Sequence, residues 1–208
     1  LGFGRTIGYD LVNEKPGFLP DTSFYNNRYG KNRWKALTII SLAIGQGEIG
    51  VSPLQMANVT AAIANRGFYY SPHIVKSIGD SVNIMRGLTD RHYISADSVN
   101  FEYILQGMEE AVNGGSGATA TIAAINDIIV CGKTGTAQNP HGKDHSIFVA
   151  FAPKDKPEIA IAVYIENAGF GATYAAPVAS LIMEKYLKGT VSRKYLEDYV
   201  MGLHMNEQ

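Results

Sequence analysis

Residues 131–138, CGKTGTAQ, place one lysine and two hydroxyl side chains within four positions, directly after the apolar run IIV. Because side chains alternate along a strand, Lys133 and Gly135 would lie on one face, and Thr134 and Thr136 on the other. A lysine and two hydroxyls can hold an anion, and Gly135 would let a substrate backbone come close. The segment therefore predicts a strand edge that binds a peptide by its main chain and its terminal carboxylate. The alternative is an edge strand that a lysine protects against aggregation.

Two short matches to nucleotide-binding motifs fail on their context. The GQGEIG of residues 45–50 matches G-x-G-x-x-G, but it follows a run with helical spacing, and no acidic residue stands about 20 positions further on. The GKT of residues 132–134 resembles the end of a phosphate-binding loop, yet Asp127 stands where that loop needs its first glycine. A phosphate loop also needs backbone N–H groups that turn into a helix, whereas the residues before GKT have the composition of a strand. A nucleotide-binding domain remains an alternative that a nucleotide-dependent thermal shift would test.

The composition favours a globular domain with a peptide or small-molecule partner. The chain has 208 residues, 46% of them hydrophobic, and 18 basic against 19 acidic side chains give a formal net charge of -1. Such a chain can bury a full core, and nothing in its charge favours nucleic acid or an anionic membrane. Its apolar stretches fall short of the ~20 residues that a membrane span needs. Since the chain lacks an initiator methionine, we expect a fragment without its leader or anchor.

The cysteine and histidine residues predict neither a disulfide nor a metal site. Cys131 is the single cysteine, and its apolar neighbours indicate a buried hydrophobic side chain more than a reactive thiol. His141, Asp144 and His145 lie close together, but Gly142 makes a turn there and no further ligand cluster is visible. We expect no metal and no cofactor.

The sequence predicts helices followed by a strand meander. Residues 1–33 have the Gly, Pro and Asn content of loops and turns, and residues 68–78 suggest a short hairpin. One helix has Ser52 as its N-cap, and Gly67 closes it. The expected helices are 34–44, 53–66, 98–112, 177–187 and 191–203. The expected strands are 128–136, 146–152 and 158–166, joined as an antiparallel meander.

The GKTGTAQ segment resembles the third motif of penicillin-recognising serine D,D-transpeptidases. The similarity covers nearly the whole chain and is greatest to class B, monofunctional penicillin-binding proteins of the elongation type (penicillin-binding protein 2). The other segments that carry it are LGFGRTIGYDLVNE at 1–14, IGQGEIGVSPLQMANVTAAIA at 44–64, HSIFVAFAP at 145–153 and ENAGFGATYAAP at 166–177.

This resemblance implies a fold and a chemistry. The fold would be α+β, an antiparallel sheet packed with helices, as in the serine β-lactamase/transpeptidase-like fold. The reaction would be acyl transfer, in which a serine attacks the penultimate D-Ala carbonyl of a peptidoglycan stem peptide and β-lactams acylate the same serine. Lys133 and Thr136 would be catalytic, with the Thr136 N–H in the oxyanion hole. Thr134, Gly135 and Thr136 would bind the substrate.

The first two motifs of the family are not found in their expected places. No serine of the chain is followed by a lysine three residues later, so the nucleophile motif S-x-x-K is missing. Two S-x-N matches begin at Ser81 and Ser98, but the family places this motif further upstream, so we interpret the first as a turn and the second as a helix start. We therefore expect residues 1–208 to be the C-terminal portion of a transpeptidase domain, inactive alone. A non-catalytic β-lactam or peptide sensor of the same fold is the alternative.

The resemblance also implies a cellular setting. Expected partners are the D-Ala-D-Ala stem peptide, β-lactams and the cell-wall elongation machinery with its membrane glycan polymerase, and not nucleic acid. The expected location is the periplasmic face of the bacterial inner membrane, held by an N-terminal anchor outside these residues.

Overall fold

The computed structural model of the chain describes residues 2–8, 10–76 and 89–203. The chain divides into two compact units. The first unit is Leu1–Gln55 with Ser71–Asp90, and the second is Met56–Tyr70 with Arg91–Gln208. Among the described residues, no helix combines the length and the apolar character that crossing a membrane requires.

The first unit contains a helix that the sequence analysis missed. Residues 1–33 were expected to be loop, but α1 spans Thr22–Tyr29. Asp21 caps it, because its Oδ1 accepts a hydrogen bond of 2.8 Å from the Phe24 N–H. Tyr25 is 3% exposed and packs against neighbouring aromatic rings. Aromatic burial therefore holds a helix whose sequence has little helical periodicity.

The next helical segment of this unit is tighter and shorter than expected. The prediction of a helix over 34–44 is confirmed in part, as a 3-10 helix, η1, over Ala36–Ile44. Gly45 ends it in the left-handed conformation (φ 74°), and its N–H donates to the Leu42 carbonyl. Gly47 also has a positive φ, of 82°. With two glycines at positive φ, the glycine-rich segment 45–50 forms a turn.

The helix α2, Pro53–Ala64, begins as the sequence predicts. Ser52 Oγ accepts from the Gln55 N–H at 3.2 Å, and Gln55 Oε1 accepts from the Ser52 N–H at 2.9 Å. The helix ends at Ala64, two residues earlier than expected, and Gly67 closes the turn that follows, with a φ of 114° and its N–H donating to the Ala62 carbonyl. The buried Nε2 of Gln55 also donates to three carbonyls, those of Gly2, Arg5 and Pro16.

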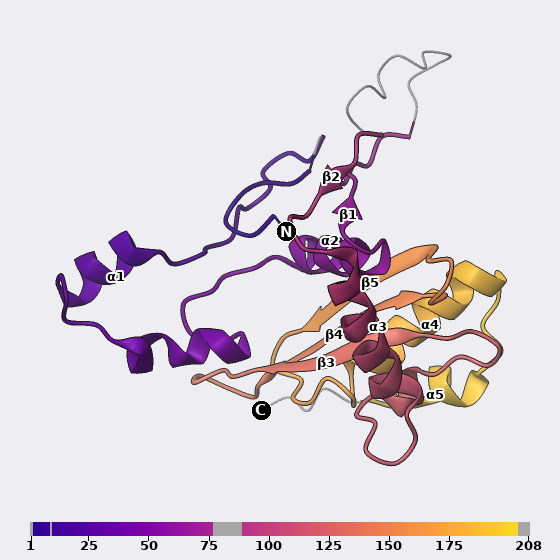
Figure 1. Ribbon diagram of the computed structural model, residues 1–208. Helices are drawn as coiled ribbons and strands as arrows, with labels where there is room; N and C mark the ends of the chain where they lie inside the picture. The colour runs from indigo at the N-terminus through magenta and orange to yellow at the C-terminus, as the bar shows by residue number, and fades with distance from the viewer. Residues whose placement is uncertain (1, 9, 77–88, 204–208) are drawn as a thin grey trace. The chain divides into compact units, whose positions relative to one another are not determined.

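The second unit is built on a three-stranded antiparallel sheet. Its strands are β3 (Cys131–Ala137), β4 (His145–Ala152) and β5 (Ile159–Ile165), in the order β3-β4-β5 (Figure 1). The expected meander is confirmed, because the strands expected over 146–152 and 158–166 pair in this order. Short connections between successive strands produce this arrangement.

The strand β3 begins three residues later than expected over 128–136. Asp127 has a φ of 63°, and an isolated bridge joins Ile125 to Ile128. A tight turn therefore occupies the start of the apolar run, which leads into the strand without being part of it.

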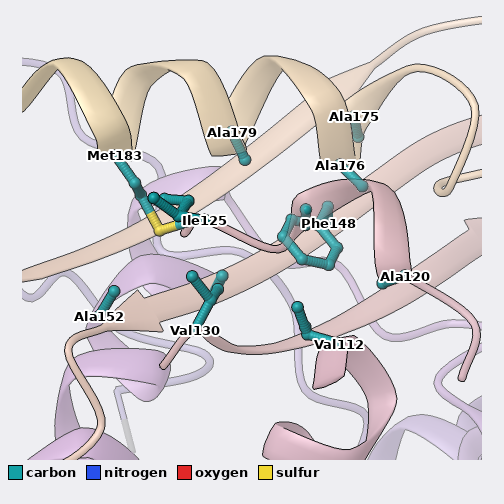
Figure 2. Packing of buried hydrophobic residues seen from close by; sticks show 12 residues of the cluster. Val112, Ala120, Ile125, Val130, Phe148, Ala152, Ala175, Ala176, Ala179 and Met183 are labelled. Carbon is teal, nitrogen blue, oxygen red and sulfur yellow. The ribbon is translucent and has the colours of Figure 1, made fainter. Parts of the chain in front are cut away.

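The helices α3 (Ser98–Asn113) and α4 (Ala175–Lys188) pack against the sheet. The short η3 (Thr121–Ala123) packs against both of them, and α5 (Lys194–Gly202) packs against α4. Alternation along β4 sends Phe148 and Phe151 to opposite faces, and both are fully buried. Phe148 lies beneath Ala176 of α4, and Met183 of the same helix lies beside Ile125 in the same cluster (Figure 2). Phe151 packs with α3 residues such as Leu105. The helices expected over 98–112 and 177–187 are thus confirmed, and that over 191–203 is shorter.

The hairpin expected over 68–78 is wrong in its pairing. The strand β1 (Phe68–Tyr69) instead pairs antiparallel with β2 (His92–Tyr93). The Arg91 guanidinium lies 4.6 Å from the centre of the Phe68 ring, which adds a cation–π contact to this pair. The last two residues of the expected hairpin lie outside the described part of the chain.

Candidate active site

The four residues Lys133 to Thr136 lie on β3, the first strand in the sheet order. One edge of β3 pairs with β4, and no strand among the described residues pairs with its other edge. The pleat places Lys133 and Gly135 on one face and Thr134 and Thr136 on the other. The structure therefore brings all four predicted site residues to a strand that has an edge open for pairing.

The first two residues of β3 anchor this strand in the core. Cys131 is fully buried, and burial raises the pKa of its thiol to about 12, with the Glu109 carboxylate adding to the effect. The predicted role as a buried hydrophobic side chain is confirmed. Gly132 lies under the Phe148 ring, where an added Cβ would come within 2.5 Å of the ring. The strand is thus fixed in the core directly before Lys133, the first of the four predicted site residues.

Lys133 and Thr134 form a small exposed cluster with a third residue. Lys133 Nζ donates to the Thr134 carbonyl at 2.9 Å and lies 3.5 Å from Thr134 Oγ1. The Thr134 hydroxyl in turn donates to Thr119 Oγ1 at 3.4 Å. A positive charge and two hydroxyls are therefore neighbours, as an anion site requires. We call Lys133, Thr134 and Thr119 the edge cluster.

The segment after β5 holds the sheet at the other end of the site. Ser146 stands opposite Thr136 in the register. Its hydroxyl donates to the Phe170 carbonyl at 3.0 Å and accepts from the Ala175 N–H at 3.1 Å. Gly171 lies so close that an added Cβ would be 2.3 Å from the carbonyl oxygen at 147 and 2.7 Å from that at 135. This close packing fixes the backbone around Thr136.

The residues considered in the sequence as possible metal ligands, and the serine that begins the second S-x-N match, make hydrogen bonds or helix contacts that stabilise the fold. The Asp144 carboxylate accepts from the Asn139 N–H, and His145 Nδ1 accepts from the Asn167 N–H, both at 3.1 Å. No three His, Cys, Asp or Glu side chains converge as metal ligands within the described residues. Ser98 begins α3, which confirms its interpretation as a helix start. The segment at Ser81 lies outside the described residues.

The sequence analysis missed Thr119 and Gly171. Thr119 lies 15 residues before Thr134, on a turn rich in glycine and alanine, and no motif singles it out. Gly171 belongs to the GFGATYAAP segment, whose glycines gave a usable signal of close backbone approach.

The geometry agrees with the comparisons with known proteins. Residues 1–184 match the family model of the penicillin binding protein transpeptidase domain. The chain belongs to this family. The peptidoglycan D,D-transpeptidase MrdA of Haemophilus influenzae is 32% identical over an alignment of 204 residues that covers 90% of this chain and 31% of the relative. The MrdA of Acinetobacter baumannii is 33% identical, over 90% of this chain and 30% of that protein.

Solved structures of the family confirm the fold. PBP2 of Pseudomonas aeruginosa, in complex with WCK 5153, superposes with a TM-score of 0.78 at 33% identity, over 93% of this chain and 44% of that one. PBP2 of Helicobacter pylori, in a complex with MreC, gives a TM-score of 0.74 at 27% identity, over 90% and 34%. The α+β, transpeptidase/β-lactamase-like fold is therefore confirmed. The chain spans about a third of the length of the curated relatives it matches.

Proposed function

We propose that this chain supplies the substrate-carboxylate and oxyanion part of a peptidoglycan D,D-transpeptidase active site. The observation that carries the proposal is the strand β3, which presents lysine, threonine, glycine and threonine along an edge that a peptide can pair with. Membership of the transpeptidase family and relatives named peptidoglycan D,D-transpeptidases support this chemistry.

In the proposed reaction a stem peptide pairs with the edge of β3 and ends at the edge cluster. A serine hydroxyl attacks the carbonyl carbon of the penultimate D-Ala; the new C–O bond forms, the C–N bond breaks, and the terminal D-Ala leaves with a proton on its amine. An amine of a stem peptide on a neighbouring peptidoglycan strand then attacks the acyl carbon, and the bond to the serine oxygen breaks. The Thr136 backbone N–H stabilises the oxyanion, the Thr134 and Thr136 hydroxyls bind the substrate carboxylate, and Lys133 contributes positive potential.

The serine belongs to polypeptide other than these residues, since no S-x-x-K occurs within them. We take residues 1–208 as the C-terminal portion of the transpeptidase domain. The substrate is the D-Ala-D-Ala stem peptide, β-lactams are its mimics, and the enzyme works with the elongation machinery at the periplasmic face of the inner membrane. The H. pylori relative solved with MreC supports such partners, and the P. aeruginosa PBP2 solved with WCK 5153 shows a relative holding a small molecule.

The experiment uses the full-length protein, a fluorescent penicillin and mass spectrometry. We expect acylation at a serine outside residues 1–208, and D-Ala release from a stem peptide. Thr136→Pro should slow acylation by roughly a hundred- to a thousandfold, because proline has no N–H to donate to the oxyanion. Thr136→Ser, which keeps both the backbone N–H and the hydroxyl, is the matched control and should retain most of the rate.

Each part of the proposal has its own contrary result. Acylation of a serine within residues 1–208 would refute the location of the nucleophile. A folded Thr136→Pro protein that acylates at the wild-type rate would refute the role of the Thr136 N–H. Acylation without any D-Ala release would favour the sensor over the enzyme.

A further inference from the structure

The contact between Thr119 and Thr134 has the geometry of a shared anion site. Their Oγ1 atoms lie 3.4 Å apart, well beyond the ~2.8 Å of a typical O–H···O hydrogen bond. A direct bond of this length is weak, so both hydroxyls can turn toward a stronger acceptor with little loss. The Lys133 side chain reaches around the strand edge, so that its Nζ lies 3.5 Å from Thr134 Oγ1 and adds a positive charge next to the pair.

Thr119 is exposed, but the backbone around it is held in place. On its N-terminal side, the Ala118 N–H donates to the Gly115 carbonyl at 3.1 Å. On its C-terminal side, Ala120 is 1% exposed, and its N–H donates to the Ala111 carbonyl at 2.9 Å. An exposed side chain on such a backbone is prepared for a ligand, because little conformational freedom remains to be lost on binding.

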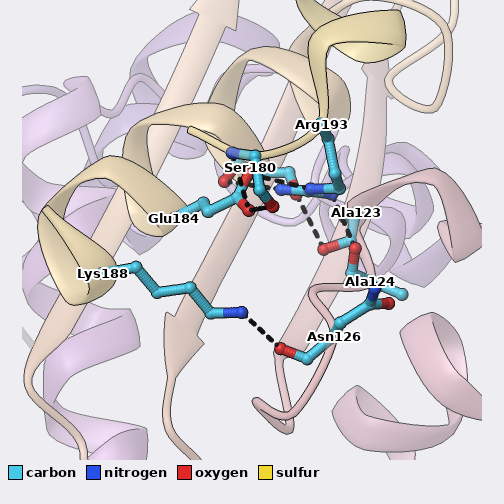
Figure 3. Close-up of polar contacts among 8 residues, drawn as sticks. Ala123, Ala124, Asn126, Ser180, Glu184, Lys188 and Arg193 are labelled. Atoms are coloured by element: carbon cyan, nitrogen blue, oxygen red, sulfur yellow. Dashed lines mark hydrogen bonds and ion pairs between the residues drawn. The ribbon is translucent and has the colours of Figure 1, made fainter. Parts of the chain in front are cut away.

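The C-terminal helices fix the chain that follows Thr119. Three side-chain donors of this region reach three carbonyls of the segment that runs from the last residue of η3 toward β3 (Figure 3). The bonds run from Ser180 Oγ to Ala123 O (2.9 Å), from Arg193 Nη1 to Ala124 O (2.6 Å) and from Lys188 Nζ to Asn126 O (2.8 Å). The turn that carries Thr119 is therefore tied to the core from both directions.

From this geometry we infer that Thr119 is a third hydroxyl of the carboxylate site and a determinant of specificity for substrates with a free carboxylate. The inference rests on the proposed function. A carboxylate has two oxygens and about four acceptor positions, so it can accept from Thr119 and Thr134 together while Lys133 balances its charge. A hydroxyl that only braced Thr134 would act through the Thr134 hydroxyl, so its removal would have no further effect in a Thr134→Val protein. A hydroxyl that binds the carboxylate directly would still slow acylation by the acid when it is removed from the Thr134→Val protein.

The test compares two ligands on the full-length protein: a penicillin as the free acid and the same penicillin as its methyl ester. Thr119→Val should lower the second-order acylation rate for the acid by about tenfold and leave the rate for the ester nearly unchanged, because the ester lacks the charge that strengthens the bond. Thr119→Ser keeps the hydroxyl and should restore the rate for the acid. Thr121→Val, an exposed threonine two residues further on, is the matched control and should change neither rate.

The outcomes separate this inference from the proposed function. If the wild-type protein forms no adduct with either ligand, the proposed function fails, and the inference fails with it. If the wild-type protein is acylated but Thr119→Val slows both ligands equally, slows neither, or has no further effect on the acid in the Thr134→Val protein, the inference fails alone.

Discussion

Two polar clusters of the second unit differ in how completely their groups are satisfied. The edge cluster is exposed, and its hydroxyl contact is long, at 3.4 Å. The other cluster is an elbow formed by Arg193 with Glu184, Ser180 and Ser192, where α4 turns back toward α5. Within this elbow the side chains of Arg193 and Glu184 are 7% and 1% exposed, and Arg193 Nε donates to Glu184 Oε2 at 2.9 Å.

The elbow has used its hydrogen-bonding capacity, and the edge cluster has not. Arg193 also donates to Ser180 Oγ at 2.8 Å, and the Ser192 hydroxyl donates to Glu184 Oε1 at 2.6 Å. Buried charges are tolerated when they are paired in this way, and such a network specifies one arrangement of the chain. Hydroxyls at an open edge can instead exchange water for substrate. The elbow therefore has a structural role, whereas the edge cluster has the open hydrogen-bonding capacity that the proposed function requires.

The largest expected effect comes from breaking the elbow. Arg193→Met leaves the Glu184 carboxylate buried without its ion pair, which should destabilise the second unit by about 3–5 kcal/mol. The double variant Arg193→Met with Glu184→Met removes both charges and should be markedly more stable than the single variant. Hydrogen exchange of the slowest amides of α4 and β4 in the full-length protein measures this change.

A purely structural role of the elbow requires that the folded fraction of the Arg193→Met protein still be acylated at close to the wild-type rate. Corrected for the folded fraction, acylation by Arg193→Met should fall far less than its stability. If the single and double variants were equally unstable, loss of packing and not an unpaired charge would be the cause, and the contrast between the two clusters would weaken.

At the edge cluster we expect a smaller effect, on the acylation rate and not on the stability. Thr134→Val should slow acylation by a penicillin with a free carboxylate by about tenfold, which corresponds to about 1.4 kcal/mol. The thermal midpoint should hardly move, because Thr134 is only half-buried and its hydroxyl bond is weak. Thr134→Ser is the control and should behave like the wild type. A large loss of stability with unchanged acylation would reverse the assignment of the two clusters.

Local signals account for the part of the fold that the sequence predicted. The meander and α3 carry strong periodicity and turn residues, and α2 carries a reciprocal cap between Ser52 and Gln55. The pairing of β1 with β2 depends instead on contacts between residues about 24 positions apart, such as Phe68 with Tyr93. The helix α1 was missed because buried aromatic rings stabilise it, and composition alone does not reveal burial.

The candidate site was predicted in part for the same reason. The residues on β3 form one continuous motif, so their alternation could be derived from strand geometry alone. Thr119 reaches Thr134 through a fold in which Arg193, 74 residues further along, helps to hold the intervening chain. Such a contact has no local pattern and requires the tertiary structure.

The smallest expected effect is the pH dependence of the stability that the elbow contributes through Glu184. Burial acts to raise the pKa of the Glu184 carboxyl, but hydrogen bonds from Ser192 and Arg193 outweigh it, so the pKa lies below its ordinary value of 4.5. A carboxyl whose pKa is lowered by folding stabilises the protein fully above its ordinary pKa, and this contribution is lost as the pH falls through the lowered value.

The difference in unfolding free energy between the wild type and Glu184→Gln should therefore be constant near neutral pH and shrink below about pH 4.5. Denaturant unfolding of both proteins at a series of pH values measures it, with Glu197→Gln on the more exposed α5 as the control. A difference that grew on acidification would mean that burial, and not hydrogen bonding, dominates at Glu184.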